Sequence, residues 1–276
     1  MTRLWVMSDL HLEAVPYPQS FRPLRPDFDV LVVAGDVFQG DASHALRIVA
    51  ALADGRPSVF VMGNHEYWNG SVLADLEPAR DEAARLGVTL LEGDEAEVAG
   101  MRFLGGTLWS DGWLGGHAMV AGAQTGEPID ITAGVEGHRL LTNSDAARLH
   151  SLLRARLEAQ LLDDTRTRDH DARPVVVVTH HAPHPLCMPE HLWGSWAAGN
   201  SASDLSHLTD TGLVDLWIHG HTHRTQSLTR PGGTRIVTNA AGPRAANLDF
   251  LDDLVLSVIP SNDRSVARIH AVAATC

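Results

Sequence analysis

The sequence contains no lysine, and all 21 of its basic residues are arginines. A Schiff-base mechanism and a phosphate-binding P-loop both depend on a lysine side chain, so both are excluded. Positive charge for a phosphate group must therefore come from arginine, histidine, backbone N–H groups or a bound metal. A biased genomic base composition also produces proteins without lysine, and it is the simpler explanation of this absence.

Cysteines and long apolar runs are scarce as well. The two cysteines, Cys187 and Cys276, lie far apart in the chain, which is not the pattern of a disulfide framework and favours the reducing cytoplasm. No apolar run approaches the length of about 20 residues that a membrane-spanning helix needs, and the first residues lack the features of a signal peptide. We therefore expect a cytoplasmic protein with no membrane partner.

Acidic residues outnumber basic ones, giving a formal net charge of −13. Proteins that track along nucleic acid present basic surfaces, so this charge disfavours a long nucleic acid as partner. Hydrophobic residues make up 44% of the 276 residues, which is enough for one substantial core. We expect a single domain over residues 1–276, and the composition indicates no particular oligomeric state.

Apolar runs alternate with amphipathic segments through the first third of the chain. Asp41 or Ser43 can cap the first predicted helix, and Pro78 either kinks the second or marks a new start. This alternation predicts parallel strands with helices on the outer faces. The predicted strands are residues 4–8, 30–34, 58–62 and 88–91, and the predicted helices are residues 42–53 and 72–86.

The rest of the chain is predicted to hold one long helix, further strands and two irregular stretches. Residues 143–162 carry leucines on one stripe of a helix. Residues 110–137 have the composition of an irregular insertion, and residues 182–206 that of a long loop. The further predicted strands are residues 97–98, 102–104, 175–179, 216–219, 234–238, 254–259 and 266–272.

Side chains of the kinds that bind metals follow these strands in five short motifs. Carboxyl ends of strands are where α/β sheets gather ligands, so we expect the motifs to converge. Residues two apart on an extended chain face the same way, so the paired ligands of the first and last motifs can converge. Any one motif alone means little, and the argument comes from all five in order. The motifs are Asp9-Leu10-His11, Gly35-Asp36, Gly63-Asn64-His65-Glu66, His180-His181 and Gly220-His221-Thr222-His223.

The side chains in these motifs suit a pair of divalent transition-metal ions. A carboxylate such as that of Asp36 has two oxygens and can bridge two cations. Sets of metal-ligating side chains that are rich in imidazole favour Mn, Fe, Zn, Co or Ni over calcium, which is bound by oxygen ligands. Two such ions are the usual apparatus for cleaving a phosphate ester. The candidate ligands are two carboxylates, one amide and four imidazoles: Asp9, Asp36, Asn64, His11, His180, His221 and His223.

Between Asp9 and His223 the ordered motifs resemble those of the calcineurin-like metallophosphoesterase family. The resemblance implies an α/β fold, α+β in some schemes: a four-layer α-β-β-α sandwich of two mixed sheets flanked by helices. It also implies a dinuclear centre in which Asp36 is shared. By motif position, one metal would be bound by Asp9, His11, Asp36 and His223, and the other by Asp36, Asn64, His180 and His221.

The function implied is hydrolysis of a small phosphodiester or phosphomonoester, with the diester slightly favoured. A hydroxide bridging the two ions would attack phosphorus in line. His65 adjoins Asn64 without being a ligand in the family pattern, so we predict that it donates a hydrogen bond or a proton to the leaving group. Glu66 is a candidate to orient His65, on sequence adjacency alone.

The sequence signal for substrate recognition is weaker than that for metal binding. Four residues are candidates for lining the pocket. Trp68 offers an aromatic face for stacking, and Arg244 a phosphate contact. His181 either lines the pocket or packs, and Glu66 completes the set. Two other functions are compatible with the motifs: a nuclease or cyclic-nucleotide phosphodiesterase, and a non-catalytic protein-binding scaffold of the same fold. The complete ligand set favours an enzyme over the scaffold.

Overall fold

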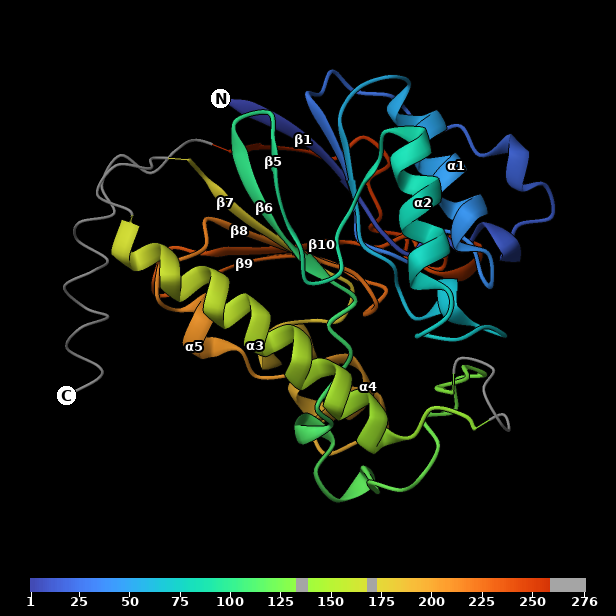
Figure 1. The fold of residues 1–276 in the computed structure, drawn as a ribbon, viewed down its shortest axis with the longest axis vertical. Coiled ribbons are helices and arrows are strands. Elements are labelled where there is room, and N and C mark those ends of the chain that lie inside the picture. Colours follow the sequence, from blue (N-terminus) through green and yellow to red (C-terminus); the bar gives the residue numbers. More distant parts are fainter. Residues whose placement is uncertain (133–138, 168–172, 259–276) are drawn as a thin grey trace.

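The computed structural model describes residues 1–132, 139–167 and 173–258, and places two β-sheets between layers of helices (Figure 1). In the first sheet, neighbouring strands run parallel except for the last strand in sequence, which is antiparallel to the first. In spatial order its strands are β11 (Val255–Val258), β1 (Thr2–Met7), β2 (Val30–Val33), β3 (Ser58–Phe60) and β4 (Thr89–Leu90).

The second sheet is also mixed, with four central parallel strands and an antiparallel strand at each edge. In spatial order its strands are β5 (Glu95–Val98), β6 (Met101–Gly106), β7 (Val175–Thr179), β8 (Leu216–His219), β10 (Arg235–Asn239) and β9 (Thr225–Thr229). The alternation of strands and helices in the first third of the chain correctly predicted the parallel pairing of β1, β2, β3 and β4.

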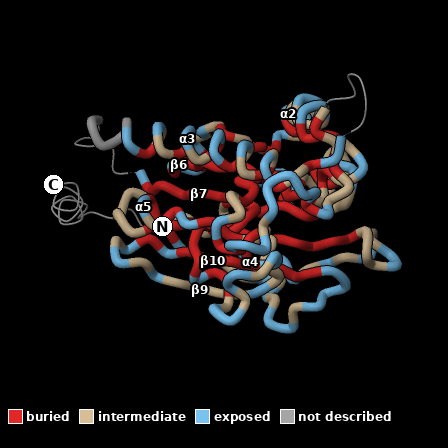
Figure 2. Tube along the Cα trace, turned by 90° about the horizontal axis from the view of Figure 1, so that it is seen from below, coloured by how far each residue is buried: buried red, intermediate tan, exposed pale blue. Residues whose placement is uncertain are grey.

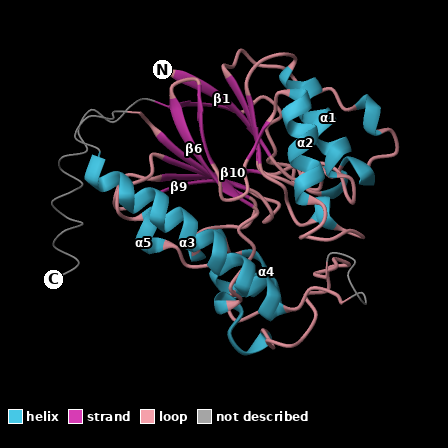
Figure 3. Cartoon of the chain, in the orientation of Figure 1, coloured by secondary structure: helices cyan, strands magenta, loops and turns pink. Residues whose placement is uncertain are grey.

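Helices cover the outer face of each sheet (Figure 3). On the first sheet lie α1 (Ala42–Ala53) and α2 (Leu76–Leu86), and on the second lie α3 (Asn143–Thr167), α4 (Trp196–Ser201) and α5 (Ser206–Thr209). The 3-10 helices are η1 (Leu12–Ala14), η2 (Pro18–Ser20), η3 (His65–Tyr67), η4 (Trp113–Ala118), η5 (Pro185–Cys187), η6 (Glu190–Leu192) and η7 (Pro243–Ala245).

Alternating side chains of the strands fill three separate layers of core. In β1, Leu4 and Val6 pack between the two sheets, whereas Trp5 and Met7 pack beneath α1 and α2. Strand β7 alternates in the same way between the inter-sheet core and the core beneath α3. Strands buried on both faces have continuous apolar sequences, and Figure 2 shows such strands as unbroken buried stretches. The four-layer sandwich of two mixed sheets is confirmed.

Several local expectations are refined. Helix α3 runs to Thr167 rather than residue 162, because no glycine or proline interrupts it. Pro78 lies in the first turn of α2, so it marks a start and not a kink. The carboxylate of Asp41 caps α1 by accepting the His44 N–H at 2.7 Å. Residues 182–206 are not a plain loop, since they form η5, η6 and α4, which are too short to show a period.

The predicted strands and the described strands differ at two places. Strand β9 was missed because it is a half-exposed edge strand with a mostly polar sequence. The strand predicted at residues 266–272 lies outside the described residues.

Residues 110–132 are irregular, as expected, with η4 and isolated β-bridges, one of which joins Asp130 to Ser71. Among the described helices, none combines the length and apolarity that a bilayer crossing requires.

Candidate metal centre

The five motif loops follow β1, β2, β3, β7 and β8, and they meet where both sheets present the carboxyl ends of their parallel strands. Backbone hydrogen bonds join the loops within the first sheet, from Asp9 N to Gly35 O at 2.9 Å and from His11 N to Asp36 O at 3.0 Å. The second sheet is joined to the first where the His221 N–H donates to the Asp9 carboxylate at 2.9 Å. Ligands from both sheets therefore converge as predicted.

The backbone at this centre is strained. Five of the seven predicted ligands have left-handed φ angles, a region that non-glycine residues rarely adopt. Such conformations cost of the order of 1 kcal/mol each, and they persist where the surrounding structure and the function require them. The left-handed ligands are Asp9 (53°), His11 (44°), Asp36 (56°), His221 (64°) and His223 (49°).

One group of candidate ligands consists of Asp9, His11, Asp36 and His223. The Nε2 atoms of His11 and His223 are 3.1 Å apart. His223 Nε2 also lies 3.3 Å from Asp9 Oδ1, and His11 Nε2 lies 3.7 Å from Asp36 Oδ2. These four side chains are the set that the motif positions assign to one metal.

The second group consists of Asp36, His180 and His221, with Asn64 between the two imidazoles. Asn64 Oδ1 lies 3.0 Å from both His180 Nε2 and His221 Nδ1. His180 Nε2 lies 3.2 Å from Asp36 Oδ2, the same oxygen that faces His11. Asp36 therefore belongs to both groups, and its shared oxygen lies between them.

The hydrogen-bonding states of two imidazoles fit cation binding. His180 Nδ1 lies 2.7 Å from the Ala34 carbonyl oxygen and can only donate to it. The neutral ring then carries its lone pair on Nε2, which faces the acceptor oxygens of Asn64 and Asp36. His11 repeats this arrangement, with Nδ1 against Glu13 Oε1 at 3.1 Å. Acceptors that converge on acceptors need a proton or a metal cation between them, so these residues fit a pair of divalent ions.

The electrostatics of the cluster support the same conclusion. Burial alone would raise the pKa of Asp36, but His180, His65 and His11 hold that pKa well below its usual range, so the carboxylate stays ionised. Burial opposes protonation of His180 as well, yet Asp36 raises its pKa to about 10. The centre thus draws positive charge onto its own imidazoles, and a bound metal would replace that charge.

His65 lies at the edge of the centre, where its backbone N–H donates to Asp36 Oδ1 at 2.9 Å. Its ring stacks on Trp68, with ring centroids 3.9 Å apart and an interplanar angle of 21°. The edge of the ring meets His11, with centroids 4.6 Å apart. This places His65 and Trp68 together beside the first group of ligands, with the ring of His65 half-buried.

Glu66 does not orient His65, which corrects the expectation from sequence adjacency. Its buried carboxylate accepts four backbone N–H groups: Gly63 at 2.7 Å, Asp36 at 2.9 Å, Val37 at 2.6 Å and Phe38 at 3.2 Å. Glu66 therefore ties the loop after β2 to the loop after β3, and its carboxylate faces those loops rather than a pocket.

The other two pocket candidates take different positions. His181 packs: it is buried, stacks on His221 with centroids 4.2 Å apart, and contacts the Thr107 carbonyl oxygen through Nδ1. Burial, with the nearby His180, lowers the pKa of His181 to about 3, so it supports its neighbour as a neutral ring. Arg244 is exposed in η7, in a loop whose Gly242 N–H donates to the Asp9 carbonyl oxygen at 2.9 Å.

Sequence reasoning missed two acidic residues. Glu13 contacts His11, and its position two residues after His11 was a usable signal. Glu127 accepts a hydrogen bond from the indole N–H of Trp68, and the Asn64 amide partly offsets the rise in the pKa of Glu127 that burial causes. It comes from the irregular stretch at residues 110–132, where neither periodicity nor a motif in the sequence indicates a functional residue.

The glycine at position 63 is required by a close approach. A Cβ atom at Gly63 would lie 2.1 Å from Asp36 Oδ1 and 2.7 Å from the Asp36 backbone nitrogen. We expect Gly63→Ala to displace the shared carboxylate and to weaken metal binding at least about tenfold, measured by chelator competition. Gly122→Ala is the matched control, since a Cβ there meets nothing within 4 Å and the backbone is not left-handed. Unchanged affinity in Gly63→Ala would contradict the shared role of Asp36.

The centre opens to solvent on one side. Asp9, His11, Asp36, Asn64 and His180 are buried, whereas His223 is 38% exposed. His65 and His221 are half-buried beside it. His65, His221 and His223 therefore form the side of the centre that solvent reaches.

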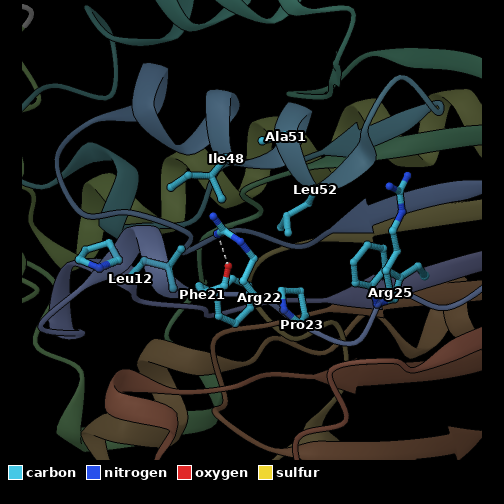
Figure 4. A pocket seen from close by; sticks show the side chains of 10 residues that line it. Leu12, Phe21, Arg22, Pro23, Arg25, Ile48, Ala51 and Leu52 are labelled. Atoms are coloured by element: carbon cyan, nitrogen blue, oxygen red, sulfur yellow. Dashed lines mark hydrogen bonds between the residues drawn. The ribbon is translucent and has the colours of Figure 1, made fainter.

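A separate cavity of about 450 Å³ lies between the loop near residues 18–25 and α1 (Figure 4). Its lining has no carboxylate and no imidazole. Its two arginines already bind protein groups, Arg22 the Phe21 carbonyl oxygen and Arg25 the carboxylate of Asp54. This cavity offers no groups for chemistry at phosphorus. Its lining consists of Trp5, Leu12, Pro18, Phe21, Arg22, Pro23, Arg25, Ile48, Ala51 and Leu52.

Known proteins share both the sequence pattern and the fold. The family model described as calcineurin-like phosphoesterase matches residues 2–225. A solved structure of a phosphopantetheinyl hydrolase from Mycobacterium tuberculosis is similar, with a TM-score of 0.61 and 19% identity over 94% of this chain and 96% of that one. A dimetal phosphatase from Danio rerio matches with a TM-score of 0.47 and 15% identity over 86% of each chain. No protein of curated function matches the sequence.

Proposed function

This chain belongs to the calcineurin-like phosphoesterase family, and we propose that it hydrolyses a small phosphate ester using two divalent ions. One ion would be held by Asp9, His11, Asp36 and His223, and the other by Asp36, Asn64, His180 and His221. The single observation that carries this proposal is the position of Asp36 Oδ2, within 3.7 Å of His11 Nε2 and 3.2 Å of His180 Nε2.

Each residue at this centre would have a separate role in the reaction. When bound, a pair of divalent ions supplies an activated water and stabilises charge on the phosphoryl oxygens. Asp36 stays ionised and holds the two ligand groups together. His65, at the open edge of the centre, protonates the leaving oxygen or donates a hydrogen bond to it. The buried ligands Asp9 and Asn64 exclude bulk water from the inner side.

The substrate that we propose is small, with a diester slightly favoured over a monoester. A net charge of −13 argues against long nucleic acid but is compatible with a mononucleotide. The test is a panel of chromogenic monoesters and diesters, with cyclic nucleotides included, assayed with added Mn²⁺ and with chelator. We expect Mn²⁺-dependent hydrolysis that chelator abolishes. A strong preference for monoesters would overturn the diester proposal, and hydrolysis that is indifferent to chelator would overturn the metal proposal.

Replacing His65 with alanine tests the proposed acid. For an ester with a poor alkoxide leaving group, we expect kcat to fall by about 10²–10⁴-fold, because proton donation matters most there. For a nitrophenyl ester, whose leaving group needs no proton, the loss should stay below about tenfold. Metal content, measured by mass spectrometry of the protein's metals, should match the parent protein.

The control for His65→Ala is His207→Ala, which removes an exposed imidazole paired with Glu158 outside the cluster. It should leave kcat and metal content unchanged. Equal losses on both esters, or a loss of metal in His65→Ala, would show that His65 is not the acid.

A further inference from the structure

Glu127 lies outside all five motifs, yet it contacts two residues of the proposed catalytic centre. The side-chain amide of Asn64 lies close enough to its carboxylate to act on the charge there, and that carboxylate accepts a hydrogen bond from the indole N–H of Trp68. We propose that Glu127 is a positioning residue that orients a metal ligand, Asn64, and the proposed acid, His65. This inference rests on the proposed function, because it takes Asn64 as a ligand and His65 as the acid.

The first contact fixes which way the amide of Asn64 faces. Asn64 Oδ1 points to His180 Nε2 and His221 Nδ1, each 3.0 Å away. The oxygen and nitrogen of an asparagine amide have nearly the same shape, so a half-turn would present NH₂ to a cation. A carboxylate oxygen attracts an NH₂ group and repels an amide oxygen, so Glu127 favours the NH₂ group on its own side. The amide oxygen is thereby left facing the metal position.

The second contact reaches His65 through Trp68. The indole N–H donates to Glu127 Oε2, and the indole ring stacks on the imidazole of His65 at 3.9 Å between centroids. Among the described residues, no hydrogen-bond partner holds His65 Nδ1, which is buried. Stacking on Trp68 and the edge contact with His11 therefore set the plane of the ring. The hydrogen bond that holds the indole of Trp68 in place therefore also holds the plane of the His65 imidazole.

Backbone pairing holds Glu127 itself in place. The chain just after η3 meets the segment that contains Glu127, with Asn69 N donating to Pro128 O at 2.7 Å and Asp130 N donating to Gly70 O at 2.8 Å. The Glu127 N–H donates to Thr125 Oγ1 at 3.2 Å. The irregular stretch is thus tied to the loop that carries Asn64 and His65, and this delivers one carboxylate to both side chains.

Three variants separate the two contacts. Glu127→Ala removes both. Glu127→Gln keeps one acceptor oxygen but turns an NH₂ group towards the other donor. Trp68→Phe removes the indole N–H and keeps an aromatic ring for stacking. Glu190→Ala, an exposed glutamate in η6, is the matched control.

The first readout needs no substrate: Mn²⁺ is titrated calorimetrically into metal-free protein. We expect Glu127→Ala to weaken one of the two binding events by about 10–100-fold, as loss of a group that orients a ligand does. Glu127→Gln should be intermediate, and Trp68→Phe and Glu190→Ala should bind as the parent does. Parent-like Mn²⁺ affinity in Glu127→Ala would overturn the role towards Asn64.

The second readout is the dependence of kcat on the leaving group. Trp68→Phe and Glu127→Ala should lose more activity on alkyl esters than on nitrophenyl esters. Equal losses on both, together with a lowered Tm in Glu127→Ala, would overturn the positioning role and leave a structural one. If the parent protein hydrolyses no phosphate ester, the proposed function fails. Weakened Mn²⁺ binding by Glu127→Ala would even then support the contact with Asn64.

Discussion

Replacing Asp36 with alanine should abolish hydrolysis, with kcat falling by more than about 10³-fold, because water activation and charge stabilisation both depend on the ions that this residue holds. The carboxylate is buried and ionised, and its Oδ2 atom belongs to both groups of candidate ligands. Of the described side chains in those two groups, only that of Asp36 belongs to both. We therefore expect both ions to be lost together, measured as metal per chain after dialysis.

The second oxygen of Asp36 gives the variant a further consequence. Asp36 Oδ1 accepts the backbone N–H of His65 at 2.9 Å, so its loss also frees the start of η3. Asp36→Asn separates the two effects, because its amide keeps one oxygen to accept that N–H but loses the charge that bridges two cations. We expect Asp36→Asn to retain at most one ion and to be nearly inactive.

The control for this series is Asp41→Ala. Asp41 caps α1 five residues later, and losing a helix cap costs about 1 kcal/mol of stability. Its metal content and kcat should match those of the parent protein. Two ions retained in Asp36→Ala would show that the groups bind independently and that Asp36 does not bridge them.

The sequence predicted that the candidate ligands would converge, because each lies in a short motif directly after an apolar strand. Local patterning sets the strands, and parallel pairing brings their carboxyl ends together, so convergence follows without knowledge of tertiary contacts. The seven candidate ligands are found in two groups that share Asp36, with Asn64 placed between two imidazoles of the second group. The positions of these candidate ligands can therefore be predicted from local sequence patterns alone.

The roles of the glutamates could not be predicted in the same way. Glu127 reaches Trp68 across 59 residues, from a stretch without periodicity, so nothing local in the sequence marks the contact. Glu66 does lie in a motif, but three of its four partners are backbone amides of a loop about 30 residues away. Backbone groups have no sequence identity, so a side chain that binds them leaves no complementary residue to find.

Replacing Glu66 with alanine should give the largest loss of stability. The change leaves four backbone N–H groups without their acceptor, and an unpaired buried donor costs about 1–3 kcal/mol. Water entering the vacated space would satisfy some of them, so we expect the free energy of unfolding to fall by about 3–5 kcal/mol in total. Urea unfolding of chelator-treated protein measures this loss apart from metal binding.

Two further variants show whether the acceptors or the side-chain volume matter. Glu66→Gln keeps the volume but turns an NH₂ group towards donors that need an acceptor, so most of the loss should remain. Glu77→Ala is the control, since Glu77 is 80% exposed in a surface pair with Arg80 and should change stability by less than about 0.5 kcal/mol. If Glu66→Gln were as stable as the parent protein, packing rather than hydrogen bonding would explain the effect.

Metal binding by Glu66→Ala tests how the centre is built. Glu66 holds the loop of Asp36 against the loop of Asn64, so the two ligands should lose their preset spacing when it is removed. Binding would then have to order both loops, and affinity for the ion that they share should fall along with stability. If stability fell while affinity stayed at the parental value, the remaining ligands and the glycine contacts at Gly35 and Gly63 would be sufficient to preset the site.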